Sequence, residues 1–182
     1  MKENSELIHY ACAESIVKLF KHSMPKDNSK EILKLFFDYP VKFIEGGINL
    51  YLQRASSLFL CLMIEYLKSQ SENELLNIIT PSIVSLFIKT SYESSFLYDS
   101  LLHLINSELS FNHFSDRLKD IYEKLIKIIE NLKTADNSKV SCANIFKSIG
   151  QRLLKDKGQT IIGFYLSDVN YCLKNLTKDR IS

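Results

Sequence analysis

The sequence predicts an all-α fold, a right-handed α-solenoid of about eight helices arranged in antiparallel pairs. Apolar residues recur at the 3.6-residue spacing of a helix through most of the 182 residues. The chain holds only 5 Gly and 3 Pro, fewer than a turn-rich β protein needs. Helix starts also recur at intervals of about 44 residues. We expect one domain over residues 1–182.

Eight amphipathic segments justify this fold class. They cover residues 5–22, 29–47, 48–67, 73–87, 95–108, 115–132, 140–154 and 159–178. Ser29 and Asn73 are N-cap residue types, and each is followed by an acidic residue in the first turn, where the helix dipole favours it. Pro40 is expected to bend or interrupt the second segment, and Gly46-Gly47 to close it.

The third segment, Ile48 to Leu67, is the most apolar stretch of the chain. Its inner portion from Ala55 to Ile64 carries no charge, so a single apolar stripe cannot describe it. Its uncharged run is too short to span a bilayer, which takes about 20 apolar residues. We expect this segment to be a helix covered by neighbours on several sides, and we expect no membrane insertion.

The second half of the chain repeats the pattern. Pro81 lies inside the fourth segment, and Lys89 to Ser94 forms its exit loop. Ser115 opens the sixth segment, and Asp136-Asn137-Ser138 terminates it before the seventh begins. Lys157-Gly158 separates the seventh segment from the eighth.

Two interleaved series set the repeat length. The cap-like starts at Ser29, Asn73, Ser115 and Gln159 are separated by 44, 42 and 44 residues, and the small residues Ala11, Ala55, Ser100 and Ala143 by 44, 45 and 43. A repeat of about 40 to 47 residues built from helix pairs is typical of HEAT and armadillo solenoids. An irregular eight-helix bundle is the alternative.

The composition points to a binding function. No Walker or dinucleotide-binding glycine pattern, GxSxG elbow or HExxH helix is present, so we expect no enzyme activity, cofactor or metal. Cys12, Cys61, Cys142 and Cys172 lack metal-ligand spacing and are expected to be buried free thiols in a reducing, cytoplasmic or nuclear compartment. After residue 116, lysine and arginine outnumber aspartate and glutamate. Aromatic residues do not interleave with these basic residues, so we expect no nucleic-acid binding.

The last segment carries two apolar stripes. Ile161, Tyr165, Val169, Cys172 and Leu176 form one, and Ile162, Leu166 and Leu173 form the other. A terminal solenoid helix normally shows a polar outer face. The second stripe therefore predicts contact with further repeats, with a partner or with a second copy. We expect a piece of a longer protein or an oligomerising unit.

Four stretches also carry a family resemblance: LQRASSLFLCLMIEYL, IITPSIVSLF, DNSKVSCANIFKSIGQRLL and DVNYCLKNLTKDR. In this order they resemble the HEAT-type, TOG-like domain of the tortifolia and spiral class of microtubule-associated proteins. The resemblance covers about Phe43 to Arg180. Where that family usually has an Asp-Trp pair, this chain has Asp136-Asn137, and it contains no Trp.

The resemblance implies that tubulin or microtubules bind along the turns within each helix pair, which gives a cytoskeletal or ciliary location. Mapped onto this sequence, the expected contacts are Lys42, Lys89, Tyr92, Lys133, Lys139, Lys178 and Arg180. Basic side chains on one edge would orient an acidic partner such as tubulin. Two alternatives stay open: a generic HEAT or armadillo scaffold for another protein, and a Bcl-2-like protein that binds a partner helix in a groove.

Overall fold

The computed structural model describes residues 2–23, 29–47, 49–91, 93–107, 114 and 116–157. These residues form an all-α structure, with no β-strand among them. The helices are α1 (Lys2–Ser23), α2 (Ser29–Gly46), α3 (Leu50–Ser69), α4 (Asn73–Lys89), α5 (Ser95–Ile105), α7 (Leu118–Glu130) and α8 (Asp136–Lys157). The prediction of an all-α fold is confirmed. The segment predicted as a helix at 159–178 lies outside the described residues.

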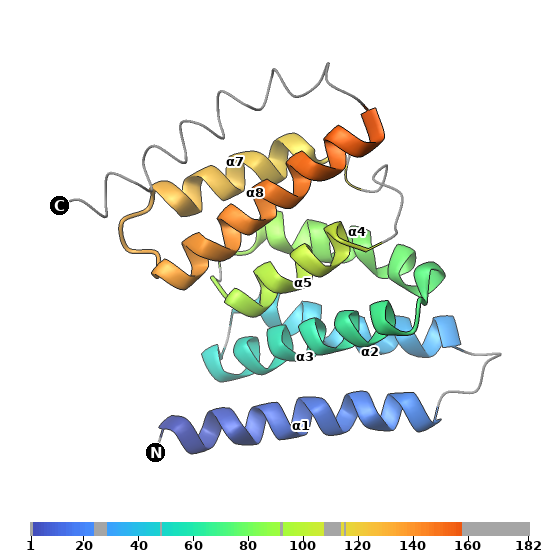
Figure 1. The fold of residues 1–182 in the computed structure, drawn as a ribbon. Helices are drawn as coiled ribbons and strands as arrows, with labels where there is room; N and C mark the ends of the chain where they lie inside the picture. The colour runs from blue at the N-terminus through green and yellow to red at the C-terminus, as the bar shows by residue number, and fades with distance from the viewer. Residues whose placement is uncertain are drawn as a thin grey trace.

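The helices stack in two layers. In one layer α1, α3, α5 and α8 contact one another in that order, and in the other layer α2, α4 and α7 do the same. The layers meet through the sequential pairs α2 with α3, α4 with α5, and α7 with α8. In Figure 1 the chain rises through these pairs from α1 at the bottom to α7 and α8 at the top. The two helices of each pair therefore lie in different layers.

The apolar helix α3 is covered as expected. It contacts α1, α2, α4 and α5, and Leu60, Met63 and Ile64 are fully buried. Burying a side chain of this kind stabilises the fold by roughly 1.5 to 3 kcal/mol before the entropy cost is subtracted. This helix therefore joins the first pair of helices to the second.

Small residues are buried in each helix of the longer layer, but they are not all the expected ones. Ala11 is exposed, and Ala13 is buried in its place. The small or compact residues with the least exposure in this layer are Ala13, Ser57, Ser100 and Cys142, which recur at 44, 43 and 42 residues. The period is that predicted, whereas the register is shifted by up to two residues, because burial depends on the face that each helix turns to its neighbour.

Several predicted helix ends are wrong. Asn73 is the first residue of α4 and not its cap, since Glu72 occupies the N-cap position without a side-chain hydrogen bond. The helix α7 begins at Leu118, three residues after the predicted Ser115. Asp136, expected to terminate the preceding helix, instead lies in the first turn of α8, where the positive end of the helix dipole favours a carboxylate.

Neither proline ends its helix. Both α2 and α4 continue past Pro40 and Pro81 for more than one turn. Next to Pro81, the buried Thr80 side chain donates a hydrogen bond from Oγ1 to the carbonyl oxygen of Leu76 at 2.7 Å. Packing against neighbouring helices thus maintains helices that proline alone would weaken.

Candidate functional site

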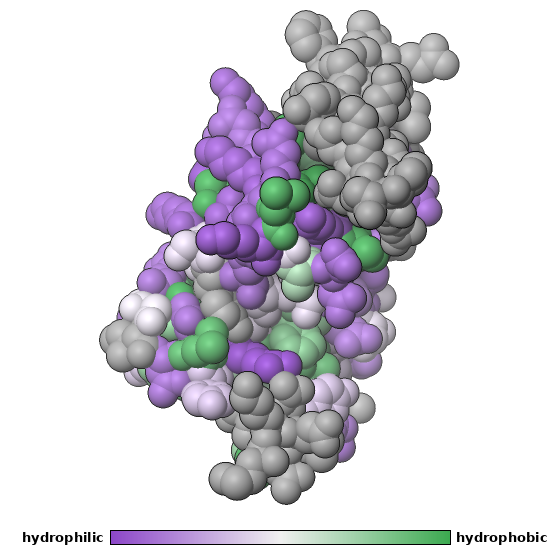
Figure 2. All heavy atoms as spheres, turned by 90° about the vertical axis from the view of Figure 1, so that its left-hand side faces the viewer, coloured by the Kyte–Doolittle hydropathy of each residue, from purple (hydrophilic) through white to green (hydrophobic). Residues whose placement is uncertain are grey.

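The turns within the three helix pairs lie on one side of the molecule. They are the segments after α2, after α4 and after α7, and all three are on the left in Figure 1. Figure 2 faces this side and shows a mostly hydrophilic surface with separate hydrophobic groups. We call this surface the turn edge: residues 42–54 (except 48, which is not described), 89–94 (except 92, likewise) and 130–136.

The first turn is fixed by its own polar groups. Gly47 has a φ of +63°, a conformation that favours glycine. The Asn49 side chain then caps α3 by accepting hydrogen bonds at Oδ1 from the backbone N–H of Tyr51 at 2.9 Å and of Leu52 at 3.3 Å. Gln53, which is buried, donates from Nε2 to the carbonyl oxygen of Ile44 at 2.8 Å. This geometry leaves the beginning of α3 at the surface.

The second turn is joined to α3 and to α7. The Ser94 and Ser57 hydroxyl groups share a buried hydrogen bond of 3.0 Å. The Thr90 carbonyl oxygen accepts a hydrogen bond of 2.7 Å from Nζ of Lys124, on α7. These bonds hold the second turn between the first and third helix pairs, and they leave Lys89 exposed at the end of α4.

The third turn is held in a similar way. The Asn131 side chain accepts a hydrogen bond of 3.0 Å from the backbone N–H of Lys133. The Thr134 hydroxyl donates to the Glu93 carboxylate on the second turn at 3.3 Å. Polar contacts therefore run along the turn edge from α3 through the second turn to the third, so neighbouring turns keep a fixed relative position.

The turn edge presents large apolar side chains to solvent. Leu50 is 65% exposed, Tyr51 60% and Leu132 83%. Tyrosine is enriched among the residues that carry most of the energy at protein interfaces. The sequence interpretation missed Tyr51, although a signal was available: Asn49 is a good N-cap, and it places Tyr51 in the exposed first turn of the helix.

The structure sorts the predicted contact residues into three groups. Lys42, Lys89 and Lys133 are exposed on the turn edge, as the prediction requires. Lys139 is only 8% exposed, so its proposed role as a surface contact is wrong: the turn ends before Asp136, and Lys139 lies inside α8. Tyr92, Lys178 and Arg180 lie outside the described residues.

The exposed charges on the turn edge balance. Basic and acidic side chains alternate along the three turns in equal number. The exposed basic residues are Lys42, Arg54, Lys89 and Lys133, and the exposed acidic residues are Glu45, Glu93, Glu130 and Asp136. A surface of this kind gives little long-range attraction to an acidic partner. Contacts by Tyr51, Leu50 and Leu132 would have to supply most of the affinity.

Burial shifts the pKa of several ionisable groups inside the helix stack. Burial raises the pKa of the Cys61 and Cys142 thiols to about 12, which keeps both as unreactive thiols at neutral pH. On α5, burial raises the pKa of Asp99 and lowers that of His103. Ser141 donates to Asp99 at 3.5 Å, at the limit of a hydrogen bond. Asp99 and His103 are thus partly buried among the helices, and their shifted pKa values result from this packing.

Cys12 differs from the other described cysteines. It is exposed on α1, which corrects the prediction of a buried thiol, whereas Cys61 and Cys142 are buried as predicted, and all three are free. Cys172 lies outside the described residues.

Within the described part of the chain, no three His, Cys, Asp or Glu side chains come together in a way that could hold a metal ion. None of the described helices is long and apolar enough to cross a membrane.

Comparisons with protein-family models, with curated proteins and with solved structures gave no match to this sequence.

Proposed function

We propose that this chain is an α-solenoid of the HEAT type that binds another protein, without catalysis, along the turn edge. The observation that supports this most is the alignment of three intra-pair turns on one side. The second turn is joined to α3 by the hydrogen bond between Ser57 and Ser94, and to the third turn by the hydrogen bond from Thr134 to Glu93. A rigid row of turns is a preorganised surface, which lowers the entropy cost of binding. The buried small residues at intervals of 42 to 44 also support a repeat of helix pairs.

The irregular helix bundle and the Bcl-2-like groove protein have less support than a stack of helix pairs. In a fold built around one central helix, the set of helices that contact the central helix differs from the set that contacts any other helix. Here α5 repeats the surroundings of α3, because each contacts the helix before and the helix after it in its own layer, together with its paired helix in the other layer. A stack of equivalent pairs accounts for both helices.

We propose tubulin as the partner. The family resemblance supplies this assignment, and the turn edge offers Lys42, Lys89 and Lys133 as cationic contacts beside the exposed Tyr51. Because Glu45, Glu93 and Asp136 offset these lysines, the binding should depend more on apolar contacts than on charge.

The test is co-sedimentation of the full chain with polymerised tubulin, together with size-exclusion binding to free tubulin, at low and moderate salt. Tyr51→Ala and Leu132→Ala should each weaken binding by about fivefold to tenfold, since truncating an interface anchor typically costs about 1 kcal/mol or more. Ile78→Ala is the matched control, because Ile78 is 40% exposed on α4 outside the turn edge. Absence of binding to either form of tubulin at low salt would refute this partner.

A further inference from the structure

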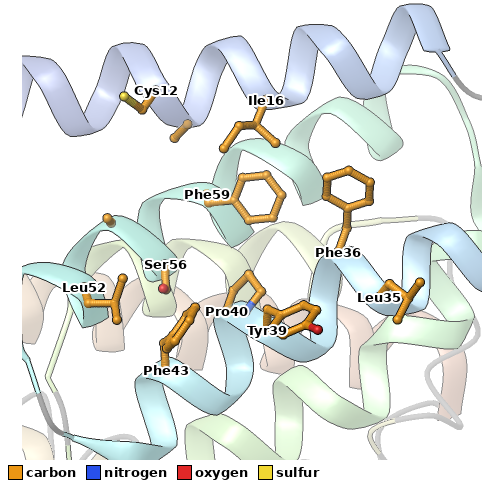
Figure 3. A pocket seen from close by; sticks show the side chains of 12 residues that line it. Cys12, Ile16, Leu35, Phe36, Tyr39, Pro40, Phe43, Leu52, Ser56 and Phe59 are labelled. Carbon is orange, nitrogen blue, oxygen red and sulfur yellow. The ribbon is translucent and has the colours of Figure 1, made fainter.

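A second surface, which borders the turn edge at Phe43 and Leu52, is hollow and apolar. The helix α1 packs mainly against α3 and meets α2 through the edge-to-face rings of Phe20 and Phe36, whose centroids are 5.4 Å apart. Beside this contact a groove of about 410 Å³ opens between α1 and α2. In Figure 3 Cys12 and Ile16 come from α1, Leu35 and Tyr39 from α2, and Ser56 and Phe59 from α3 beneath. No Lys, Arg, Asp, Glu or His of the described residues lines this groove.

The groove walls are open to solvent. Ile16 is 40% exposed, Leu35 58% and Tyr39 60%, and Leu19 on α1 is 64% exposed. Contiguous exposed apolar side chains around a concavity usually mark a surface that something covers. The absence of charge in the lining requires that the covering group be apolar as well.

The layered arrangement indicates the shape of the missing group. The helices α3, α5 and α8 each pair with a helix of the other layer, namely α2, α4 and α7. Among the described residues α1 meets α2 through the rings of Phe20 and Phe36 but does not pair with a helix of the other layer along its length. A helix that preceded α2 in its layer would lie against both α1 and α2, which is where the groove is.

The sequence predicts one more helix after α8, over residues 159–178, which lie outside the described part of the chain. If the alternation of the two layers continued, this helix would follow α7 in the shorter layer. Its sequence carries two apolar stripes. One stripe is sufficient for packing against helices of the same copy, so the other is available for contact with a second copy. At 1.5 Å per residue a helix of this length spans about 30 Å, and the 22 residues of α1 span about 33 Å. The two would match in length and in apolar character.

We propose that residues 159–178 of a second copy bind in the groove between α1 and α2, so that copies of this chain associate head to tail. The donor helix would pair with α1 of the next copy and lie beside its α2, and both layers would continue from one copy into the next. Such a contact joins two different surfaces and does not close on itself, so it also allows assemblies longer than a dimer. Phe43 and Leu52 belong both to the groove lining and to the turn edge, whereas Tyr51 and Leu132 are not among the residues that line the groove. Variants of Tyr51 and Leu132 therefore test partner binding separately from self-association.

Light scattering of the full chain over a range of concentrations tests the proposal. The average mass should rise above the 21.0 kDa of one copy as concentration increases. Ile16→Glu places a charge in the groove and should weaken association at least about tenfold. Ile78→Glu is the matched control, because Ile78 is also 40% exposed and lies outside the groove. Equal weakening by both variants, or a mass of one copy at all concentrations, would overturn the proposal.

A competition experiment keeps the test independent of any variant that fails to fold. A synthetic peptide of residues 159–178, added in excess to the full chain, should return the mass to that of one copy, and a peptide of scrambled sequence should not. If the two peptides act alike, the segment is not the occupant of the groove.

The orientation can be trapped through cysteine. Cys12 lines the groove, and Cys172 lies on an apolar stripe of the segment. Copper–phenanthroline with oxygen as electron acceptor should join the two thiols of different copies as a disulfide, with loss of two protons and two electrons. A linkage mapped to Cys12 and Cys172, absent in Cys12→Ser, supports head-to-tail contact. A linkage between two Cys12 residues would overturn it.

Discussion

At the residue scale, the conformation of the first turn depends on Gly47. Its φ of +63° is one that a side chain with a Cβ adopts only at a cost. Space is not the obstacle, because a Cβ at this position would meet only Nε2 of Gln53, at 3.9 Å. Gly150 is the opposite case, since it lies inside α8 and a methyl group there would have no atom within 4 Å.

These two glycines give a paired prediction. Gly47→Ala should lower the free energy of unfolding by about 1 to 2 kcal/mol, through backbone strain. Gly150→Ala should raise it by about 0.5 to 1 kcal/mol, because alanine reduces the entropy lost on forming a helix. Urea denaturation followed by circular dichroism measures both. An unchanged or raised free energy of unfolding for Gly47→Ala would contradict the backbone geometry described for Gly47, and a lowered one for Gly150→Ala would contradict the open space described at Gly150.

Individual side chains are the hardest features to predict from the sequence. The burial of Met63 and Ile64 follows from the uncharged run of the sequence, because a helix that is apolar on several sides has to be covered by neighbours. The burial of Lys139 does not, because it depends on where the preceding turn ends and on what packs over the beginning of α8. A lysine inside a predicted turn is therefore expected at the surface, and here that expectation is wrong.

At the scale of helices, α4 and α7 are connected by one charged hydrogen bond. Lys124 on α7 donates from Nζ to the Thr90 carbonyl oxygen at 2.7 Å, just after the last residue of α4. A cation near the end of a helix also interacts favourably with the negative end of the helix dipole. This contact therefore fixes the second turn relative to the third helix pair.

Lys124→Met should keep most of the packing of the lysine stem and remove the hydrogen bond. We expect a loss of about 1.5 kcal/mol in the free energy of unfolding, the usual contribution of a hydrogen bond from a charged donor. Lys127→Met, an exposed position on the same helix, is the control and should change stability by less than about 0.5 kcal/mol. Equal effects of the two substitutions would show that the bond to Thr90 contributes nothing.

The existence of the helices is predictable from the sequence, and their ends are less so. All the segments predicted before residue 158 are helices in the structure, because long amphipathic patterns specify helices strongly. Their ends depend on which of several polar residues supplies the cap. Asn49 does so for α3 through its side chain, whereas the predicted cap Asn73 is the first residue of α4.

At the scale of the whole molecule, the recurrence of about 44 residues predicts that alternate helices are equivalent. In the structure the described helices contact one another in two layers, with α1, α3, α5 and α8 in one and α2, α4 and α7 in the other. The groove between α1 and α2 cannot be predicted in this way, because it results from how one helix packs on α3. The periodicity of the sequence thus predicts the order of the helices, whereas the groove between α1 and α2 depends on tertiary packing.

The proposed binding along the turn edge is tested most directly by hydrogen–deuterium exchange of the full chain with and without tubulin. We expect slower exchange in peptides that cover residues 49–54, 89–94 and 130–136, with no change in peptides from α1 that line the groove. Protection confined to the groove, or the same exchange with and without saturating tubulin, would contradict binding along the turn edge.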